Sequence, residues 1–210
     1  MTDARALAGH GVELVRERAL AVRVQEALER VYHLDRVADV GDFLHEAGPG
    51  EREALLLRHG DDGALEMTLR LPQLAGADRQ LDGWCQIIEG VSHFVYVVER
   101  ARTLRETTQL ELELQAEVDK WLVLAASIRP FDVARSAALR ARLYEGVSFA
   151  HDGESEAGER YRVANDAAHS FVRRLERRYV GPGRYGDMRT ELRRFFHVGQ
   201  EEKLRLSRAA

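Results

Sequence analysis

The segment Leu81–Ile128 is the most apolar part of this 210-residue chain, yet it carries several acidic residues and a histidine. Carboxylates inside an apolar element are costly to bury unless they are paired, hydrogen-bonded or bound to a metal. From Arg105 to Ile128 the segment contains neither glycine nor proline, which favours an unbroken helix. We therefore expect a central antiparallel helix pair, at about residues 82–102 and 107–127, with acids that need partners.

The rest of the chain also favours helices, because it has only four prolines and is rich in alanine, leucine, glutamate and arginine. Apolar residues at steps of three and four predict one long helix over residues 4–32. An alternating run beside an Asp-Gly turn predicts a β-hairpin at about residues 54–71. Basic helices are expected over residues 131–209. The predicted fold is mainly α, a multi-helix bundle-like single domain (residues 1–210) with one inserted β-hairpin.

Two local questions remain open at the level of sequence. The run Gln109–Asp119 alternates strictly between polar and apolar residues, as a strand would, but glutamate, leucine, glutamine and alanine favour a helix. Helix is the preferred interpretation, with Thr107 or Thr108 as its cap and Glu111 completing a capping box. The hairpin must also pack on helices or find a third strand. Asp39 is expected to cap a short helix through His45.

Polar residues of the first central helix follow one another at steps of three and four, so they form a single stripe on an apolar helix. Such a stripe is usually the solvent-facing seam of a helix, and this is the expected outcome. The alternative is the lining of a buried polar groove. The stripe consists of Asp82, Gln86, Glu89, His93, Tyr96 and Arg100.

The same helix pair carries a candidate metal site. Glu89 and His93 are four residues apart, as are Glu113 and Glu117 on the next helix, so two pairs on antiparallel neighbours could chelate one ion. Carboxylates with imidazole suit Zn, Mn or Fe. The established bundle signature is Glu-x-x-His, however, whereas the spacing here is Glu-x-x-x-His. A simple hydrogen-bonded Glu89–His93 pair, with no cofactor, is the preferred interpretation, and a metal-dependent or acid–base enzyme is the alternative.

A second candidate site is the arginine-rich stretch Arg173–Arg194, in which aromatic residues accompany the arginines. Arginine and aromatic side chains together can hold phosphates and stack on bases. The acidic balance of the whole chain argues against a dedicated nucleic-acid binder. A solvated arginine face that pairs with the acidic N-terminal region is therefore expected, and nucleic acid or another anionic partner is the alternative. The candidate binding residues are Arg173, Arg174, Arg177, Arg178, Tyr185, Arg189, Arg193 and Arg194.

Charge and composition bound the function further. The net charge of −4 divides into −9 over residues 1–128 and +5 over residues 129–210. The single cysteine excludes an intramolecular disulfide, and the charged first thirty residues lack the apolar core of a secretory signal. The longest clean apolar run, Trp121–Ala126, is too short to span a membrane. We expect a non-catalytic cytoplasmic interaction or regulatory protein, homo-oligomeric, with the arginine-rich surface contacting a protein or nucleic acid.

Overall fold

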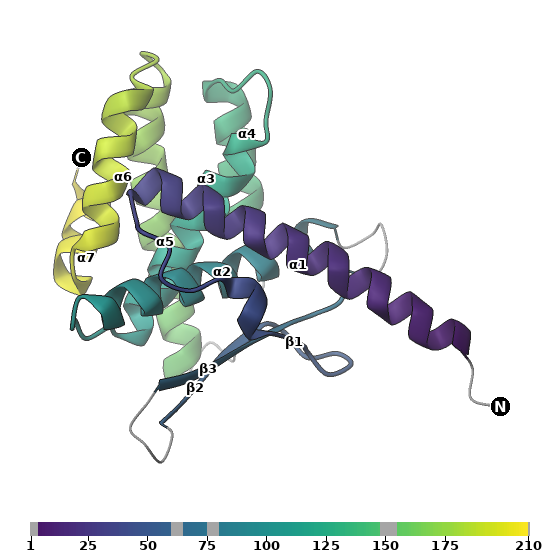
Figure 1. Cartoon of the computed structure of the whole chain (residues 1–210). Coiled ribbons are helices and arrows are strands. Elements are labelled where there is room, and N and C mark those ends of the chain that lie inside the picture. Colours follow the sequence, from purple (N-terminus) through teal and green to yellow (C-terminus); the bar gives the residue numbers. More distant parts are fainter. Residues whose placement is uncertain (1–3, 60–64, 75–79, 148–154, 210) are drawn as a thin grey trace.

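The computed structural model describes residues 4–59, 65–74, 80–147 and 155–209. It confirms a mainly α fold with an inserted β element (Figure 1). Residues from the first to the last helix contribute to one hydrophobic cluster. None of the described helices is long and apolar enough to cross a membrane. The helices are α1 (Ala4–Tyr32), α2 (Gln80–Arg102), α3 (Gln109–Ala126), α4 (Val133–Tyr144), α5 (Glu156–Leu175), α6 (Tyr185–His197) and α7 (Gln200–Arg208).

The predicted central pair is formed by α2 and α3, which pack against each other in antiparallel directions. The reversed order of the cross-helix contacts shows this, since Glu89 meets Lys120 whereas Arg100 meets Glu111. The start of α3 is fixed by a capping box. The Thr108 hydroxyl accepts from the Glu111 backbone N–H, and the Glu111 carboxylate accepts from the Thr108 N–H. The predicted cap is therefore confirmed at Thr108.

The alternating run Gln109–Asp119 is helical, as its residue types favour. Helix α3 packs against α2 on one side and α5 on another, so both its polar and its apolar residues are buried. Gln115 and Asp119, for example, are 0% and 1% exposed. The alternation therefore reflects a helix enclosed on several sides, with polar residues that each require an internal partner.

The hairpin is confirmed as β2 (Ala54–His59) paired antiparallel with β3 (Leu65–Leu71), and its turn lies outside the described residues. The third strand is β1 (Leu44–Glu46), which runs parallel to β3 at its other edge. The prediction of a helix through His45 was therefore wrong beyond residue 43. Asp39 does cap a short helix, η1 (Val40–Phe43), but the chain then extends because pairing with β3 satisfies its backbone groups.

The sheet lies against α2, and a glycine allows the close approach. A Cβ built on Gly90 would lie 2.9 Å from Leu69 Cδ1 and 3.1 Å from Leu71 Cδ2. Both leucines belong to β3 and are buried, at 0% and 4% exposed. Because Gly90 has no side chain, β3 packs directly on α2 at this point. Gly90 is the residue that follows Glu89 in the sequence.

The C-terminal region closes the other side of α3. Helix α5 continues into one π-helical segment, η3 (Glu176–Val180), and packs on both α3 and α7. Phe171 of α5 stacks on Phe195 of α6 at a centroid distance of 4.1 Å. Phe196 stacks on Tyr32 at the end of α1, 4.3 Å away. These aromatic contacts join the last helices to the first.

Candidate metal centre

The polar stripe of α2 is buried, so the expectation of a solvent-facing seam was wrong. Glu89 is 5% exposed and Tyr96 is 0% exposed, while Asp82 at the start of the helix remains accessible. The reason is that α3 covers the stripe with polar residues of its own. Arg100 lies 3.6 Å from Glu111, for example, and also donates to the Val198 carbonyl at 2.8 Å. The stripe therefore lines a buried polar layer between α2 and α3.

Three ligand-type side chains converge in this layer. One carboxylate oxygen each of Glu89 and Glu113 and one ring nitrogen of His93 all lie within 4.8 Å of one another. His93 Nε2 is 3.8 Å from Glu113 Oε2, and it is a buried atom without a hydrogen-bond partner among the described residues. Buried polar atoms are almost always paired. An unpaired imidazole nitrogen facing two carboxylates is therefore an unusual feature that a cation would satisfy.

The surroundings fix two of these ligands in orientation. The His93 ring interacts with the backbone of Leu112 on α3. With its proton on Nδ1, the ring would offer the unpaired Nε2 to a metal, the arrangement usual for metal-binding histidines. Tyr161 of α5 donates a hydrogen bond to the Glu113 carboxylate. The donor set is thus held by contacts from α3 and α5.

The fourth predicted ligand, Glu117, is not part of the converging set. Its carboxylate accepts a hydrogen bond from Lys120 Nζ at 2.6 Å, and Lys120 also donates to Glu89 Oε2 at 3.1 Å. Lys120 is 8% exposed, so its ammonium is compensated inside the protein by these two acids. Burial opposes ionisation, but Glu117 and Glu89 raise the pKa of Lys120 well above its usual value. Glu117 therefore holds a cation, the lysine ammonium.

Sequence reasoning missed a further acid beside this layer. Glu53, just before β2, has a side chain only 9% exposed, and its Oε2 has no hydrogen-bond partner among the residues described. Burial first, and then the charge of Glu89, raise the pKa of Glu53 to about 8. The same two causes raise the pKa of Glu113 to about 7. Glu53 lies near Glu89 in space but 36 residues away in sequence, so no helical spacing could have pointed to it.

The protonation states of Glu89 and His93 follow from their surroundings. Burial disfavours the Glu89 carboxylate most strongly, but the Lys120 ammonium brings the pKa of Glu89 below its usual value. Burial also lowers the pKa of His93, so the ring is neutral near pH 7. Glu89 is therefore ionised and His93 is a free base, which are the states that metal ligation requires.

A second polar cluster lies deeper between α1, α3 and α7. Asp119 accepts hydrogen bonds from the Tyr32 hydroxyl, from Ser92 Oγ at 2.6 Å and from Gln115 Nε2 at 3.0 Å. Lys203 Nζ donates to Gln115 Oε1 at 2.6 Å and to a backbone carbonyl. Each of these side chains is almost fully buried and paired. This cluster is therefore a satisfied polar network, which makes it a structural element of the core.

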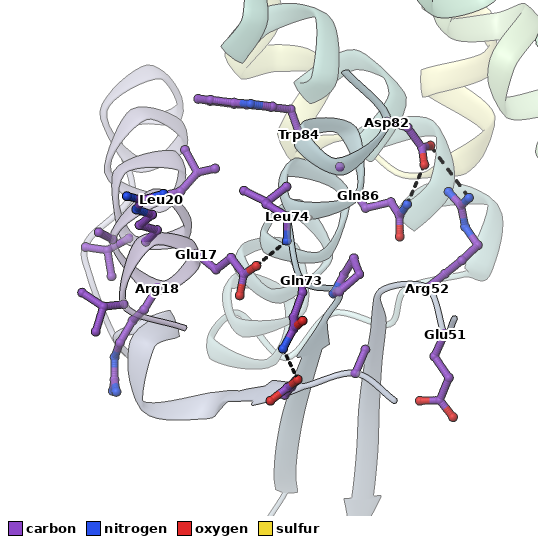
Figure 2. A pocket seen from close by; sticks show the side chains of 18 of the residues that line it. Glu17, Arg18, Leu20, Glu51, Arg52, Gln73, Leu74, Asp82, Trp84 and Gln86 are labelled. Atoms are coloured by element: carbon purple, nitrogen blue, oxygen red, sulfur yellow. Dashed lines mark hydrogen bonds and ion pairs between the residues drawn. The ribbon is translucent and has the colours of Figure 1, made fainter. Parts of the chain in front are cut away.

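A groove of about 1830 Å³ opens between α1, the loop after β1 and the start of α2 (Figure 2). Its wall includes Gln86, one turn before Glu89, and Arg52, the neighbour of Glu53. Gln86 donates to Asp82 at 2.8 Å, and Arg52 Nη1 lies 3.9 Å from the same carboxylate. The groove is thus lined by sequence neighbours of Glu89 and Glu53, and none of the candidate ligands is among its lining residues.

The arginine-rich segment divides into internal and exposed members. Arg174 is 4% exposed and pairs with Glu191 at 2.7 Å, and Arg193 donates to the Val31 carbonyl at 2.7 Å. Arg194 pairs with Glu202 at 2.8 Å. The ion pairs of these arginines therefore join C-terminal elements to one another, and one hydrogen bond reaches the end of α1. The exposed members are Arg173, Arg177, Arg178, Tyr185, Arg189 and Arg194, spread over α5, η3 and α6.

Comparisons of the chain with protein-family models, curated proteins and solved structures give no match.

Proposed function

We propose that this protein binds one divalent transition metal ion, Mn²⁺, Fe²⁺ or Zn²⁺, through Glu89, His93 and Glu113. The observation that carries the proposal is the convergence of their three ligand atoms within 4.8 Å, with His93 Nε2 buried and unpaired in the described structure. A mixed carboxylate and imidazole set suits these ions, whereas Ca²⁺ and Mg²⁺ prefer oxygen ligands alone. Burial disfavours the ionised form of Glu113, and a metal ion that replaces its proton would compensate the charge of that carboxylate.

Three protein ligands leave coordination positions free, which is the pattern of catalytic rather than structural metal sites. A metal-dependent enzyme is therefore the function that this geometry favours. The groove lined by Arg52 and Gln86 would be the place for a substrate to bind. Tyr161, hydrogen-bonded to Glu113, and Lys120, bonded to Glu89, are the polar groups nearest to the ligands from outside the set. They would orient the ligand carboxylates.

Metal titration of purified protein tests this proposal. After treatment with a chelator, the wild type should take up one equivalent of Mn²⁺, Zn²⁺ or the spectroscopic substitute Co²⁺, followed by calorimetry and elemental analysis. His93→Ala should lose this uptake, because it removes the nitrogen ligand. His169→Ala on α5 is the matched control, since His169 is also a partly buried histidine but interacts with Arg140 and Glu145. Absence of stoichiometric uptake by the wild type, or its retention in His93→Ala, would refute the proposal.

An arginine surface for an anionic partner is the second candidate function. It is supported by the exposure of Arg173, Arg177, Arg178 and Arg189, which leaves their guanidinium groups accessible on neighbouring elements. An anionic protein segment or a nucleic acid would suit such a surface, since arginine binds carboxylates and phosphates through paired donors. A cytoplasmic regulatory or self-associating role would follow from this binding. It is compatible with a metal centre elsewhere in the molecule.

A further inference from the structure

Glu53 reaches the α2–α3 layer from the sheet, and its environment does not explain why a carboxylate is there. Its side chain is 9% exposed and its Oε2 has no hydrogen-bond partner in the described part of the chain. The nearest cation is the Arg52 guanidinium, with Nε 3.8 Å from Oε2, but that side chain is 51% exposed. Burial raises the pKa of Glu53 to about 8, so this carboxyl group is protonated near pH 7, but its buried oxygen still lacks the partner that buried polar atoms almost always have. Such a group is retained where it has a use.

The fold brings this carboxylate to Glu89 through a specific close approach. An ideal Cβ on Gly90 would lie 3.7 Å from the Cβ of Glu53, so the backbone of α2 and the residue before β2 are in contact at this point. Burial first, and then the charge of the nearby Glu89 carboxylate, raise the pKa of Glu53, so the two carboxyl groups lie close enough to interact. Two carboxyl groups from different elements therefore meet at the edge of the candidate metal centre.

We infer that Glu53 is a fourth ligand of the metal centre, supplied by the sheet. This inference rests on the proposed function, because it extends the set formed by Glu89, His93 and Glu113. Glu53 lies outside the three atoms that already converge, and it contacts them through Glu89. A rotation of its side chain toward the ion would replace the contact between two carboxyl groups with two metal–oxygen bonds. The inserted hairpin would thus contribute directly to the centre, and positions for a substrate would then remain on an ion that takes more than four ligands, such as Mn²⁺ or Fe²⁺.

If Glu53 is a metal ligand, its substitution should affect metal affinity and the stability of the metal-free protein differently. Glu53→Gln keeps the size of the side chain but removes the ionisable carboxyl group, so the metal-free protein should unfold at the same temperature or a higher one. Metal affinity should nevertheless fall by roughly tenfold or more, as expected when a metal site loses a supporting group. A residue with a purely structural role would instead lower the unfolding temperature. Glu51→Gln, an exposed neighbour in the same loop, is the matched control and should leave both quantities unchanged.

Co²⁺ spectroscopy distinguishes a ligand from a residue that only orients Glu89. Loss of a direct ligand should change the intensity and position of the visible d–d absorption of the Co²⁺-loaded protein. If affinity falls in Glu53→Gln but the spectrum equals that of the wild type, Glu53 acts through Glu89 and the inference is wrong. If the wild type binds Co²⁺, His93→Ala does not, and Glu53→Gln binds as the wild type does, the inference alone fails. If the wild type itself binds no metal, the proposed function fails with it.

Discussion

The Lys120 ammonium donates a hydrogen bond to Glu89 Oε2, 3.1 Å away across the interface of α2 and α3. Lys120 is one of only two lysines in the chain, and the other, Lys203, is also buried, at 0% exposed. In a chain whose positive charge is otherwise arginine, both lysines thus lie among buried acceptors, and at Lys120 two carboxylates stabilise the compact ammonium. A guanidinium is planar and larger, so it would not occupy these positions equally well.

Replacement of Lys120 by methionine should destabilise the protein by about 3–5 kcal/mol, because it leaves Glu89 and Glu117 buried without their shared cation. The free energy of unfolding from urea titration measures this effect. The double variant Lys120→Met with Glu117→Gln should recover part of the loss, since one of the two unpaired charges is removed. A single variant within about 0.5 kcal/mol of the wild type would contradict the assigned ion pairs.

Asp119 predicts a pH dependence of stability. Burial raises its pKa from the ordinary 3.8 to about 6, despite hydrogen bonds from Ser92 and Tyr32. The folded state therefore binds this proton more tightly than the unfolded state does. The resulting stability is fully present below about pH 3.8 and is lost as pH rises through about 6. The full difference corresponds to roughly 3 kcal/mol.

Asp119→Asn removes this titration, so the free energy of unfolding should be compared between wild type and variant across pH 4–7. We expect the wild type to lose stability relative to the variant over that interval. Asp166→Asn, an exposed aspartate on α5, is the control for general effects of charge. A wild-type-minus-variant difference that stays constant across the interval would show that Asp119 does not titrate there.

The sequence was sufficient to predict those elements that have local signals, such as helix propensity and capping residues. Helix propensity correctly predicted a helix for Gln109–Asp119 despite its alternating pattern. The capping box could also be predicted, because Thr108 and Glu111 are three residues apart. The convergence of Glu89, His93 and Glu113 was also accessible from helical spacing. The burial of the polar stripe on α2 could not be predicted from the sequence, because it depends on which helix covers α2. A stripe alone does not distinguish solvent from a partner helix with equally polar residues.

The remaining errors concern contacts between elements that are distant in sequence. Pairing of β1 with β3 overrode the short helix expected through His45, and no local signal in Leu44–Glu46 identifies a parallel partner more than twenty residues away. Glu53 was missed for the same reason. One usable signal was present in Gly90, since a glycine within a long helix often marks a close approach of another segment.

The exposed arginines predict binding that depends on salt. Arg173→Ala combined with Arg177→Ala should weaken binding of a single-stranded oligonucleotide and flatten the dependence of its affinity on salt concentration, because two phosphate contacts are lost. Fluorescence anisotropy at several salt concentrations measures both quantities. Arg174→Ala is unsuitable as a probe, since that side chain is buried against Glu191. Equal affinity and equal salt dependence in the double variant and the wild type would exclude this surface as a nucleic-acid site.

Gly90→Ala tests the contact between sheet and helix. Alanine in a helix is favoured over glycine by about 1 kcal/mol, but here the added methyl would meet Leu69 Cδ1 at 2.9 Å and Leu71 Cδ2 at 3.1 Å. Overpacking of a buried position costs about 1–3 kcal/mol, so we expect net destabilisation of about 1 kcal/mol in urea unfolding. Leu69→Val in the same chain should restore part of the loss by removing bulk from the crowded site.

Gly186→Ala in α6 is the matched control for Gly90→Ala, because nothing described lies within 4 Å of its added Cβ. It should be neutral or slightly stabilising. If Gly90→Ala is equally harmless, β3 is not packed tightly on α2 at this point. Displacement of the sheet would also move Glu53 away from Glu89, so Gly90→Ala should weaken metal binding in the same direction as Glu53→Gln. Unlike Glu53→Gln, however, it should lower the stability of the metal-free protein, because it alters packing and leaves the carboxylate in place.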